Sequence, residues 1–356
     1  MRYFVKTYGC QMNKLDSEKI AGALGLKGYW LVGSYKKADL VVINTCSVRQ
    51  SAEDRVLGLL NNISKLKKKP RVILTGCMLR YSLKQLKKMM PLVDQFVEIE
   101  KLTKGVEPLR EDKNHAWVII MTGCDNYCTY CVVPFARGRE KSLGVEEIYC
   151  QILELVKRGY SKITLLGQNV NSYHKNKAFK VKDKKLKKKI LLLEKKYQNN
   201  FAVLLGLLNE IKGLEKISFM TSNPHDFTDG IIKALKLSKI DRYLHLAVQS
   251  GDDRILRRMN RKHTRKDFLD LIKKIRKSVP EIELGTDIIV GFPKETEAQF
   301  QKTVSLVKKV GFSVGFINKY SSRLGTAAYK FKDDVSIQEK KRRFGILDKI
   351  INKKKK

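Results

Sequence analysis

Three cysteines stand close together in the middle of the chain. Cys124, Cys128 and Cys131 are separated by three and by two residues, and they follow the apolar run 116–121. Such a run predicts a buried strand, so the cysteines are expected on the loop that leaves its carboxyl end. No fourth cysteine or histidine follows at close range, as a structural zinc site or an ordinary [4Fe–4S] site would require. Three thiolates would leave one metal position open for chemistry. The alternatives are a zinc site and three ordinary core cysteines.

Three further cysteines each follow a predicted strand in the N-terminal part of the chain. In an open parallel sheet, ligands bind outside the carboxyl ends of the strands, so these thiols could converge on a second cluster. Gly9 and Gly76 would let the backbone approach a cluster closely. The alternative is three buried core cysteines, and Cys150 is expected to be a packed thiol and not a ligand. The strand–cysteine pairs are 3–8 with Cys10, 39–44 with Cys46 and 70–75 with Cys77.

Short apolar runs alternate with amphipathic stretches along the chain, which predicts an α/β fold. Residues 1–112 are expected to form an open α/β domain, and residues 113–356 a second domain of six βα-type units. The second domain's predicted strands are 116–121, 162–166, 217–220, 243–248, 283–290 and 314–320.

Charge is the unusual feature of the composition. The chain of 356 residues has 73 Lys and Arg against 36 Asp and Glu, a net charge of +37. Such an excess indicates a polyanionic partner, and nucleic acid is the first candidate, although solvated lysines would also keep a protein soluble. No apolar run approaches the roughly 20 residues that span a bilayer, and the N-terminus is too short and polar for a signal peptide. We therefore expect no membrane contact and, from the cysteine usage, a reducing cytoplasmic location.

Several stretches together resemble the methylthiotransferase family of the radical S-adenosylmethionine (SAM) superfamily. The segment 124–138 is similar to the family's cluster loop, and the resemblance covers nearly the whole chain. It implies an N-terminal open α/β methylthiotransferase domain followed by a partial (β/α)6 radical SAM barrel, with an active site at the carboxyl ends of the barrel strands. The other similar stretches are 8–13, 44–49, 76–77, 165–171, 221–225, 248–251 and 291–293.

The resemblance also implies the cofactors. Two [4Fe–4S] clusters are expected, one on Cys124, Cys128 and Cys131 with SAM on its open iron, and one on Cys10, Cys46 and Cys77. The cluster and SAM would carry the chemistry, so no catalytic side chain is assigned. Arg137, Arg139, Asn169 and Asn171 could face RNA or SAM. The SAM pocket is expected to be lined by Gly167, Gln168, Gln249, Val290 and Gly291.

The implied reaction inserts sulfur at carbon 2 of N6-isopentenyladenosine beside the anticodon of tRNA and methylates that sulfur. A monomer served by an electron donor such as flavodoxin or ferredoxin is expected. One alternative is a sibling substrate, either threonylcarbamoyladenosine in tRNA or an aspartate of a ribosomal protein. Another is a non-catalytic iron–sulfur protein that binds RNA or transfers electrons.

Two departures from the family pattern bear on tRNA capture. The resemblance implies a small RNA-binding β-barrel (TRAM) domain after the radical SAM domain, and we expect this chain to lack it. A lysine-rich insertion occupies about 175–198. Between 175 and 196, eleven lysines stand against Asp183 and Glu194. We expect the distal half of the insertion to form a basic helix that, with 353–356, grips tRNA phosphates. The alternative is a disordered, solvated loop.

Overall fold

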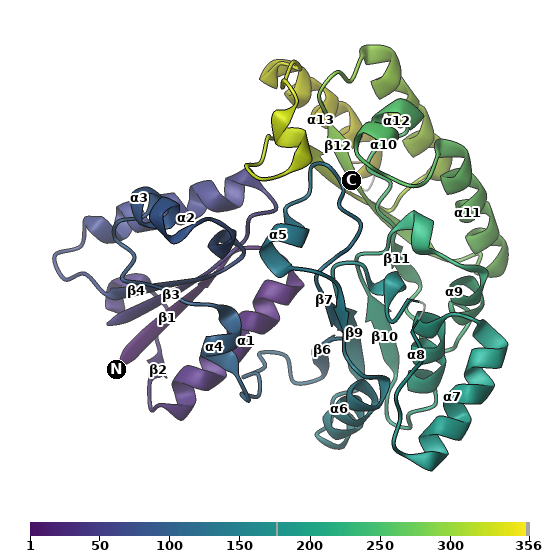
Figure 1. The fold of residues 1–356 in the computed structure, drawn as a ribbon, viewed down its shortest axis with the longest axis horizontal. Helices are drawn as coiled ribbons and strands as arrows, with labels where there is room; N and C mark the ends of the chain where they lie inside the picture. Colours follow the sequence, from purple (N-terminus) through teal and green to yellow (C-terminus); the bar gives the residue numbers. More distant parts are fainter. Residues whose placement is uncertain (176, 354–356) are drawn as a thin grey trace. The chain divides into compact units, whose positions relative to one another are not determined.

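The computed structural model describes residues 1–175 and 177–353, and they divide into two compact units (Figure 1). The first unit comprises Met1–Lys113 together with Val132–Gly138, and the second comprises Asn114–Cys131 and the residues from Arg139 onward. The short segment Val132–Gly138 thus packs with the first unit, although the residues on both sides of it belong to the second.

The first unit is built on one five-stranded parallel sheet with the order β2-β1-β3-β4-β5. All six residues of the central strand β3 are buried because helices cover both faces of the sheet. Val41 and Ile43 pack toward α2 and α3, whereas Leu40 and Val42 pack toward α1. Figure 1 shows these helices on the two faces of the sheet. The strands are β1 Arg2–Thr7, β2 Trp30–Leu31, β3 Leu40–Thr45, β4 Arg71–Gly76 and β5 Gln95–Phe96; the helices are α1 Gln11–Leu26, α2 Gln50–Ser64, α3 Leu83–Met89, α4 Ile99–Thr103 and α5 Val133–Arg137.

Six parallel strands in chain order form the sheet of the second unit. They make two three-stranded groups, β6-β9-β10 and β11-β12-β13, which the isolated bridges Ile217↔Ile240 and Ser222↔Leu246 join. The predicted α/β fold with six βα-type units is confirmed. The strands are β6 His115–Ile119, β9 Lys162–Leu166, β10 Lys216–Phe219, β11 Tyr243–His245, β12 Glu283–Val290 and β13 Val314–Lys319.

Helices cover the outside of these strands (Figure 1). Their apolar faces join the strands in one large core, in which Phe201, Phe268 and Phe300 are fully buried. The short strands β7 Met121–Thr122 and β8 Lys141–Ser142 pair in an antiparallel manner and close the segment that holds the three central cysteines. The helices are α6 Val145–Lys157, α7 Lys184–Tyr197, α8 Asn200–Asn209, α9 Asp229–Ala234, α10 Asp253–Arg258, α11 Arg265–Ser278, α12 Glu297–Val310 and α13 Ile337–Ile351.

Helix α7 lies within the lysine-rich segment and confirms the expected basic helix. Leu186, Ile190 and Tyr197 are buried on its inner side, against α8 and α9. Gly206 of α8 admits this contact, because a Cβ there would lie 2.8 Å from the Tyr197 ring. The expectation of a solvated loop therefore does not hold for 184–197. Among the described helices, none is long and apolar enough to cross a membrane.

Candidate cluster and cofactor sites

The N-terminal cysteine group comprises Cys10, Cys46 and Cys77. Cys10 precedes α1, Cys46 follows β3, and Cys77 follows β4. Because β1, β3 and β4 are neighbours and parallel, the three cysteines leave the same edge of the sheet. Burial, with a smaller contribution from the nearby Cys77, raises the pKa of Cys46 to about 11. Burial also raises the pKa of Cys77, where Cys10 acts in the same direction. The three free thiols thus lie within electrostatic reach of one another.

A hydrogen-bond network joins the loops of the N-terminal cysteine group. The Asn13 amide donates to the carbonyl oxygens of Tyr8 and Thr45, at 3.0 and 2.8 Å. The Asn44 amide donates to the Asn13 carbonyl oxygen at 2.8 Å. The Thr45 hydroxyl donates to the Thr75 carbonyl oxygen at 2.6 Å. Buried polar side chains beside the cysteines therefore hold the ends of β1, β3 and β4 together.

Two glycines make this close approach of loops possible. Gly9 has φ of 128°, and a Cβ there would lie 2.9 Å from the Cβ of Cys46. Gly76 has φ of 89°, and a Cβ there would lie 2.6 Å from Asn44 Oδ1. Both conformations favour glycine. The close approach that these glycines permit is thus an approach of the protein's own loops to one another.

The barrel cysteine group comprises Cys124, Cys128 and Cys131, on the segment between β7 and β8. Gln168, at the end of β9, fixes the start of this segment because its Oε1 accepts a hydrogen bond of 2.6 Å from the Gly123 N–H. Arg261 directs Nη1 at the Cys128 sulfur, 3.7 Å away, and donates through Nη2 to the Ala247 carbonyl oxygen at 2.7 Å. One positive charge therefore lies beside a thiol that would be an anionic ligand.

The two groups fit a cluster better than a single ion. Each thiolate of a [4Fe–4S] cluster binds its own iron, whereas the ligands of one zinc ion must converge on one point. In the part of the chain that the structure describes, no three His, Cys, Asp or Glu side chains are placed to hold one metal ion. Each group nevertheless brings three thiols together with a neighbouring arginine, which suits an anionic cluster.

The residues expected to line the SAM pocket lie at or after the ends of three strands, β9, β11 and β12. Gly167 follows β9 beside β7, and a Cβ there would lie 2.5 Å from the Met121 side chain. Gln249 has φ of 68° and extends the pairing with β12, because its N–H donates to the Asp287 carbonyl oxygen at 2.8 Å. Val290 ends β12 and is buried. Gly167 thus supports the strand that leads into the barrel cysteine group, and Gln249 lies beside β12.

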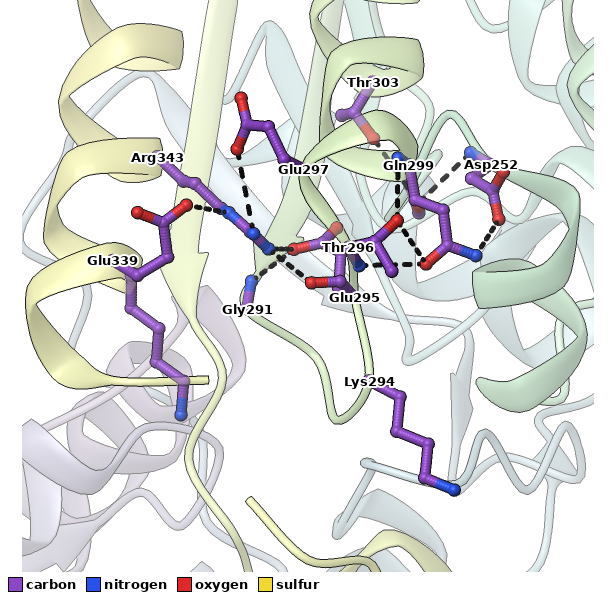
Figure 2. A network of polar contacts seen from close by, with 12 residues as sticks. Asp252, Gly291, Lys294, Glu295, Thr296, Glu297, Gln299, Thr303, Glu339 and Arg343 are labelled. Atoms are coloured by element: carbon purple, nitrogen blue, oxygen red, sulfur yellow. Dashed lines mark hydrogen bonds and ion pairs between the residues drawn. The ribbon is translucent and has the colours of Figure 1, made fainter. Parts of the chain in front are cut away.

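Gly291 has a structural partner (Figure 2). Its N–H donates to Glu295 Oε2 at 2.6 Å, and that carboxylate also accepts a hydrogen bond of 2.8 Å from Arg343 Nη1 of α13. A Cβ on Gly291 would lie 2.3 Å from Cγ of Lys340, also on α13. The glycine therefore permits α13 to pack on the end of β12, and its N–H is already bonded within the protein.

The four polar residues considered for RNA or SAM lie in different surroundings. Arg137 is half-buried and pairs with Asp16 of the first unit, whereas Arg139 forms an exposed ion pair of 2.7 Å with Asp125. The other two are buried in the second unit: the Asn169 amide donates to Asp226 Oδ2 at 2.8 Å, and the Asn171 amide donates to the Asn223 carbonyl oxygen at 2.7 Å.

Several polar positions escaped the sequence analysis. Arg261 and the buried pair Glu295–Arg343 stand in charged stretches that look like solvated surface, and their partners are distant in sequence. Asn169, in contrast, was already considered for RNA or SAM, and its buried Oδ1 has no hydrogen-bond partner among the residues that the structure describes. The expectation of a packed thiol at Cys150 was wrong, because this thiol is exposed on the outer side of α6.

Comparisons with known proteins agree with this arrangement. The model of the radical SAM superfamily matches residues 118–307, and that of the uncharacterized protein family UPF0004 matches residues 2–98. The chain is 41% identical to the tRNA-2-methylthio-N(6)-dimethylallyladenosine synthase of Clostridium botulinum, an alignment that covers 98% of this chain and 81% of that protein. The enzyme of the same name from Clostridium novyi is 42% identical over 99% of this chain and 81% of its own length.

Solved structures with low sequence identity share the fold. The radical SAM methyltransferase TsrM from Kitasatospora setae superposes with a TM-score of 0.57, at 13% identity, over 89% of this chain and 74% of that one. The cobalamin-dependent SAM radical enzyme OxsB superposes with a TM-score of 0.56, at 11% identity, over 99% of this chain and 55% of that one.

Proposed function

Because the chain belongs to the radical SAM superfamily, and within it to the family of tRNA methylthiotransferases, we propose that it adds a methylthio group to carbon 2 of N6-dimethylallyladenosine (N6-isopentenyladenosine) in the anticodon stem-loop of tRNA. The observation that carries this proposal is the identity of about two residues in five, over nearly the whole chain, with relatives that bear the name of this activity. Family membership brings SAM and a [4Fe–4S] cluster as cofactors. The proposed domains are 1–112 and 113–356, which contain the matched ranges 2–98 and 118–307.

The barrel cysteine group is the proposed site of the first cluster and of SAM. When bound, they supply a radical that can remove a hydrogen which no side-chain base could remove as a proton. Gln168 holds the cysteine segment through Gly123, and Arg261 balances the charge at Cys128. Tyr130, between two of the cysteines, packs against Ile255, Met259 and Phe292, an apolar cluster that limits access of water. Gly167, Gln168, Gln249, Val290 and Gly291 are proposed to line or support the SAM pocket.

The N-terminal cysteine group is the proposed site of the second cluster, which would carry the sulfur. Cys46 and Cys77 are buried, whereas Cys10 is exposed. The thiol of Cys10 therefore faces the side from which a substrate or a sulfur source can arrive. The buried network of Asn13, Asn44 and Thr45 keeps the three ligands in place while that open side is used.

Lysines of α7 are the proposed contacts to tRNA phosphates. Lys184, Lys185, Lys187 and Lys188 are exposed, while Leu186 and Ile190 hold the helix on the barrel. Of the terminal lysines, Lys353 has its Nζ 3.8 Å from Asp348 Oδ2. Residues 354–356 lie outside the described residues. We further propose a cytoplasmic monomer that receives electrons from a donor such as flavodoxin or ferredoxin.

Mass spectrometry of tRNA nucleosides tests the proposed function. A strain without this gene should lack the 2-methylthio form of N6-dimethylallyladenosine and accumulate the unmodified precursor. The wild-type gene should restore the product. A gene with Ala at Cys10, Cys46 and Cys77 should not, although its protein should still cleave SAM. An unchanged nucleoside profile in the deletion strain would refute the proposal. Loss of a different methylthio nucleoside would show that the enzyme acts on that nucleoside and not on N6-dimethylallyladenosine.

A further inference from the structure

Arg137 stands at the centre of the polar network beside the N-terminal cysteine group. It ends α5, in the short segment that packs with the first unit. Its Nη2 donates to Asp16 Oδ2 at 2.9 Å and to Asn13 Oδ1 at 3.2 Å. The Arg137 side chain is only 13% exposed and that of Asp16 only 6%, so both charges are largely withdrawn from water. Such a pair needs a good electrostatic reason to be buried.

The contact with Asn13 ties Arg137 to two of the three cysteine loops, those of Cys10 and Cys46. Asn13 uses its amide group to hold the loops after β1 and β3, and its Oδ1 faces both Arg137 and the thiol of Cys10, 3.5 Å away. A thiol that binds iron is a thiolate and has no proton to donate. With a cluster bound, the Arg137 guanidinium would therefore remain as a donor that holds Asn13 Oδ1 and keeps the amide in the orientation that the loops require.

The groups around Arg137 also favour a positive charge at this position. Burial alone would lower the pKa of Arg137, but the nearby Cys77, Asp16 and Cys10 outweigh it and raise this pKa. The guanidinium of Arg137 thus lies close to Cys77 and Cys10 as well as to Asp16. Three thiolates give a bound cluster a net negative charge, and each added electron makes it more negative. A fixed guanidinium beside this site stabilises that charge and favours the reduced form.

We propose that Arg137 is a positioning residue of the second cluster, which orients Asn13 and Asp16 of α1 and compensates the negative charge of the three thiolates. The inference rests on the proposed function, because it requires a cluster on Cys10, Cys46 and Cys77. It assigns a role to the segment that follows the barrel cysteine group in sequence. An ordinary structural ion pair would stabilise the fold without affecting the redox properties of a cluster.

The test uses the full chain with Ala at Cys124, Cys128 and Cys131, so that only the second cluster can form. In this background, Arg137→Gln removes the positive charge. Arg137→Lys keeps the charge but lacks the planar guanidinium. Arg2→Gln is the control, because Arg2 forms an exposed ion pair with Asp39 at the opposite end of β1. After anaerobic reconstitution, the measurements are iron and sulfide per chain, the rate of iron release to a chelator, and the reduction potential by spectroscopic titration.

In the Arg137→Gln variant, we expect a more negative reduction potential and an iron release faster by about tenfold, because an anionic cluster loses a nearby positive charge. Arg137→Lys should keep a potential close to that of the parent but release iron faster, and Arg2→Gln should match the parent in both. Circular dichroism shows whether each variant folds. If Arg137→Gln does not fold, the test depends on Arg137→Lys, and an unchanged rate of iron release in that variant refutes the inference. A parent that binds no iron refutes the second cluster itself. A parent that binds iron, with an unchanged potential and unchanged release in Arg137→Gln, refutes the role of Arg137 alone.

Discussion

Replacing Arg343 by Met should strongly destabilise the second unit, because it would strand a buried carboxylate. Arg343 of α13 donates through Nη1 to Glu295 Oε2 at 2.8 Å and to the Glu295 carbonyl oxygen at 2.9 Å. The two side chains are only 5% and 1% exposed. Figure 2 shows the guanidinium of Arg343 pointing at Glu295. Removing one partner of such a pair costs about 3–5 kcal/mol of unfolding free energy. For a unit of this size the midpoint of thermal unfolding should fall by about 6–20 °C.

The pH dependence of this loss has a definite sign. Burial raises the pKa of Glu295, whereas the Gly291 N–H and Arg343 lower it. Without Arg343 the pKa must rise further. A folded-state pKa above the unfolded value means that the protonated form favours the fold. The loss of stability should therefore be smallest below about pH 4.3, the ordinary pKa of Glu, and should grow as the pH rises through the folded-state pKa.

Two further variants separate this cause from simple loss of packing. Glu295→Gln combined with Arg343→Met removes the stranded charge, so the double variant should be about 1–3 kcal/mol more stable than Arg343→Met alone. Arg342→Met is the matched control on the same helix. Arg342 pairs with Glu339 and Glu297 at the surface, where its side chain is 46% exposed, and its loss should cost at most about 1 kcal/mol.

The assay is thermal and urea unfolding of the full chain without reconstituted clusters, over a range of pH, with hydrogen exchange of α13 as the local measurement. Exchange in 337–351 should rise in Arg343→Met and not in Arg342→Met. A cost of less than about 1 kcal/mol for Arg343→Met, or a double variant no more stable than the single one, would contradict a stranded charge at Glu295.

Three other outcomes are expected. Gln168→Leu leaves the buried N–H of Gly123 without its acceptor, so it should lower the free energy of unfolding by about 1–3 kcal/mol and weaken iron binding at the barrel cysteine group. Iron retention is measured in a background with Ala at Cys10, Cys46 and Cys77, and wild-type retention would contradict the assigned role of this contact. Replacing Lys184, Lys185 and Lys188 by Glu should weaken tRNA binding and reduce the slope of log affinity against log salt by about 2–3. The control, Glu at Lys266, Lys273 and Lys277 of α11, should leave the slope unchanged. Equal slopes in the two variants would show that α7 does not contact tRNA phosphates. Cys150→Ala, at an exposed position, should change stability by at most about 0.5 kcal/mol and leave the iron content unchanged, and lost iron would mean that the ligands are misassigned.

The elements that hold the cysteines could be predicted because local sequence determines them. Each of the runs 39–44 and 70–75 is apolar, short and followed by a cysteine, and the structure has β3 and β4 there. The edge strand β2 was missed because Trp30 and Leu31 are exposed and carry no alternating pattern. Helix α5, five residues long, is too short for a periodic signal.

Contacts between distant parts of the sequence could not be predicted. Glu295 and Arg343 are 48 residues apart, and Arg137 and Asp16 are 121 residues apart. A glycine such as Gly291 reads as a turn or a ligand contact from sequence, and only the position of Lys340 identifies it as a packing contact. Hydrophobic periodicity identifies the face that a helix buries, but it does not identify the partner of a buried charge.

The segment Val132–Gly138 has a consequence for the order in which the protein matures. The first unit contains this segment, so it is incomplete when residues 1–113 have left the ribosome. Arg137 reaches Asn13 and Asp16 only after the three barrel cysteines have been synthesised. The two units are therefore not modules that one cut can separate, and a fragment ending at residue 113 would contain Cys10, Cys46 and Cys77 but not the arginine beside them. Biogenesis of the two cysteine groups is thus linked by the course of the chain itself.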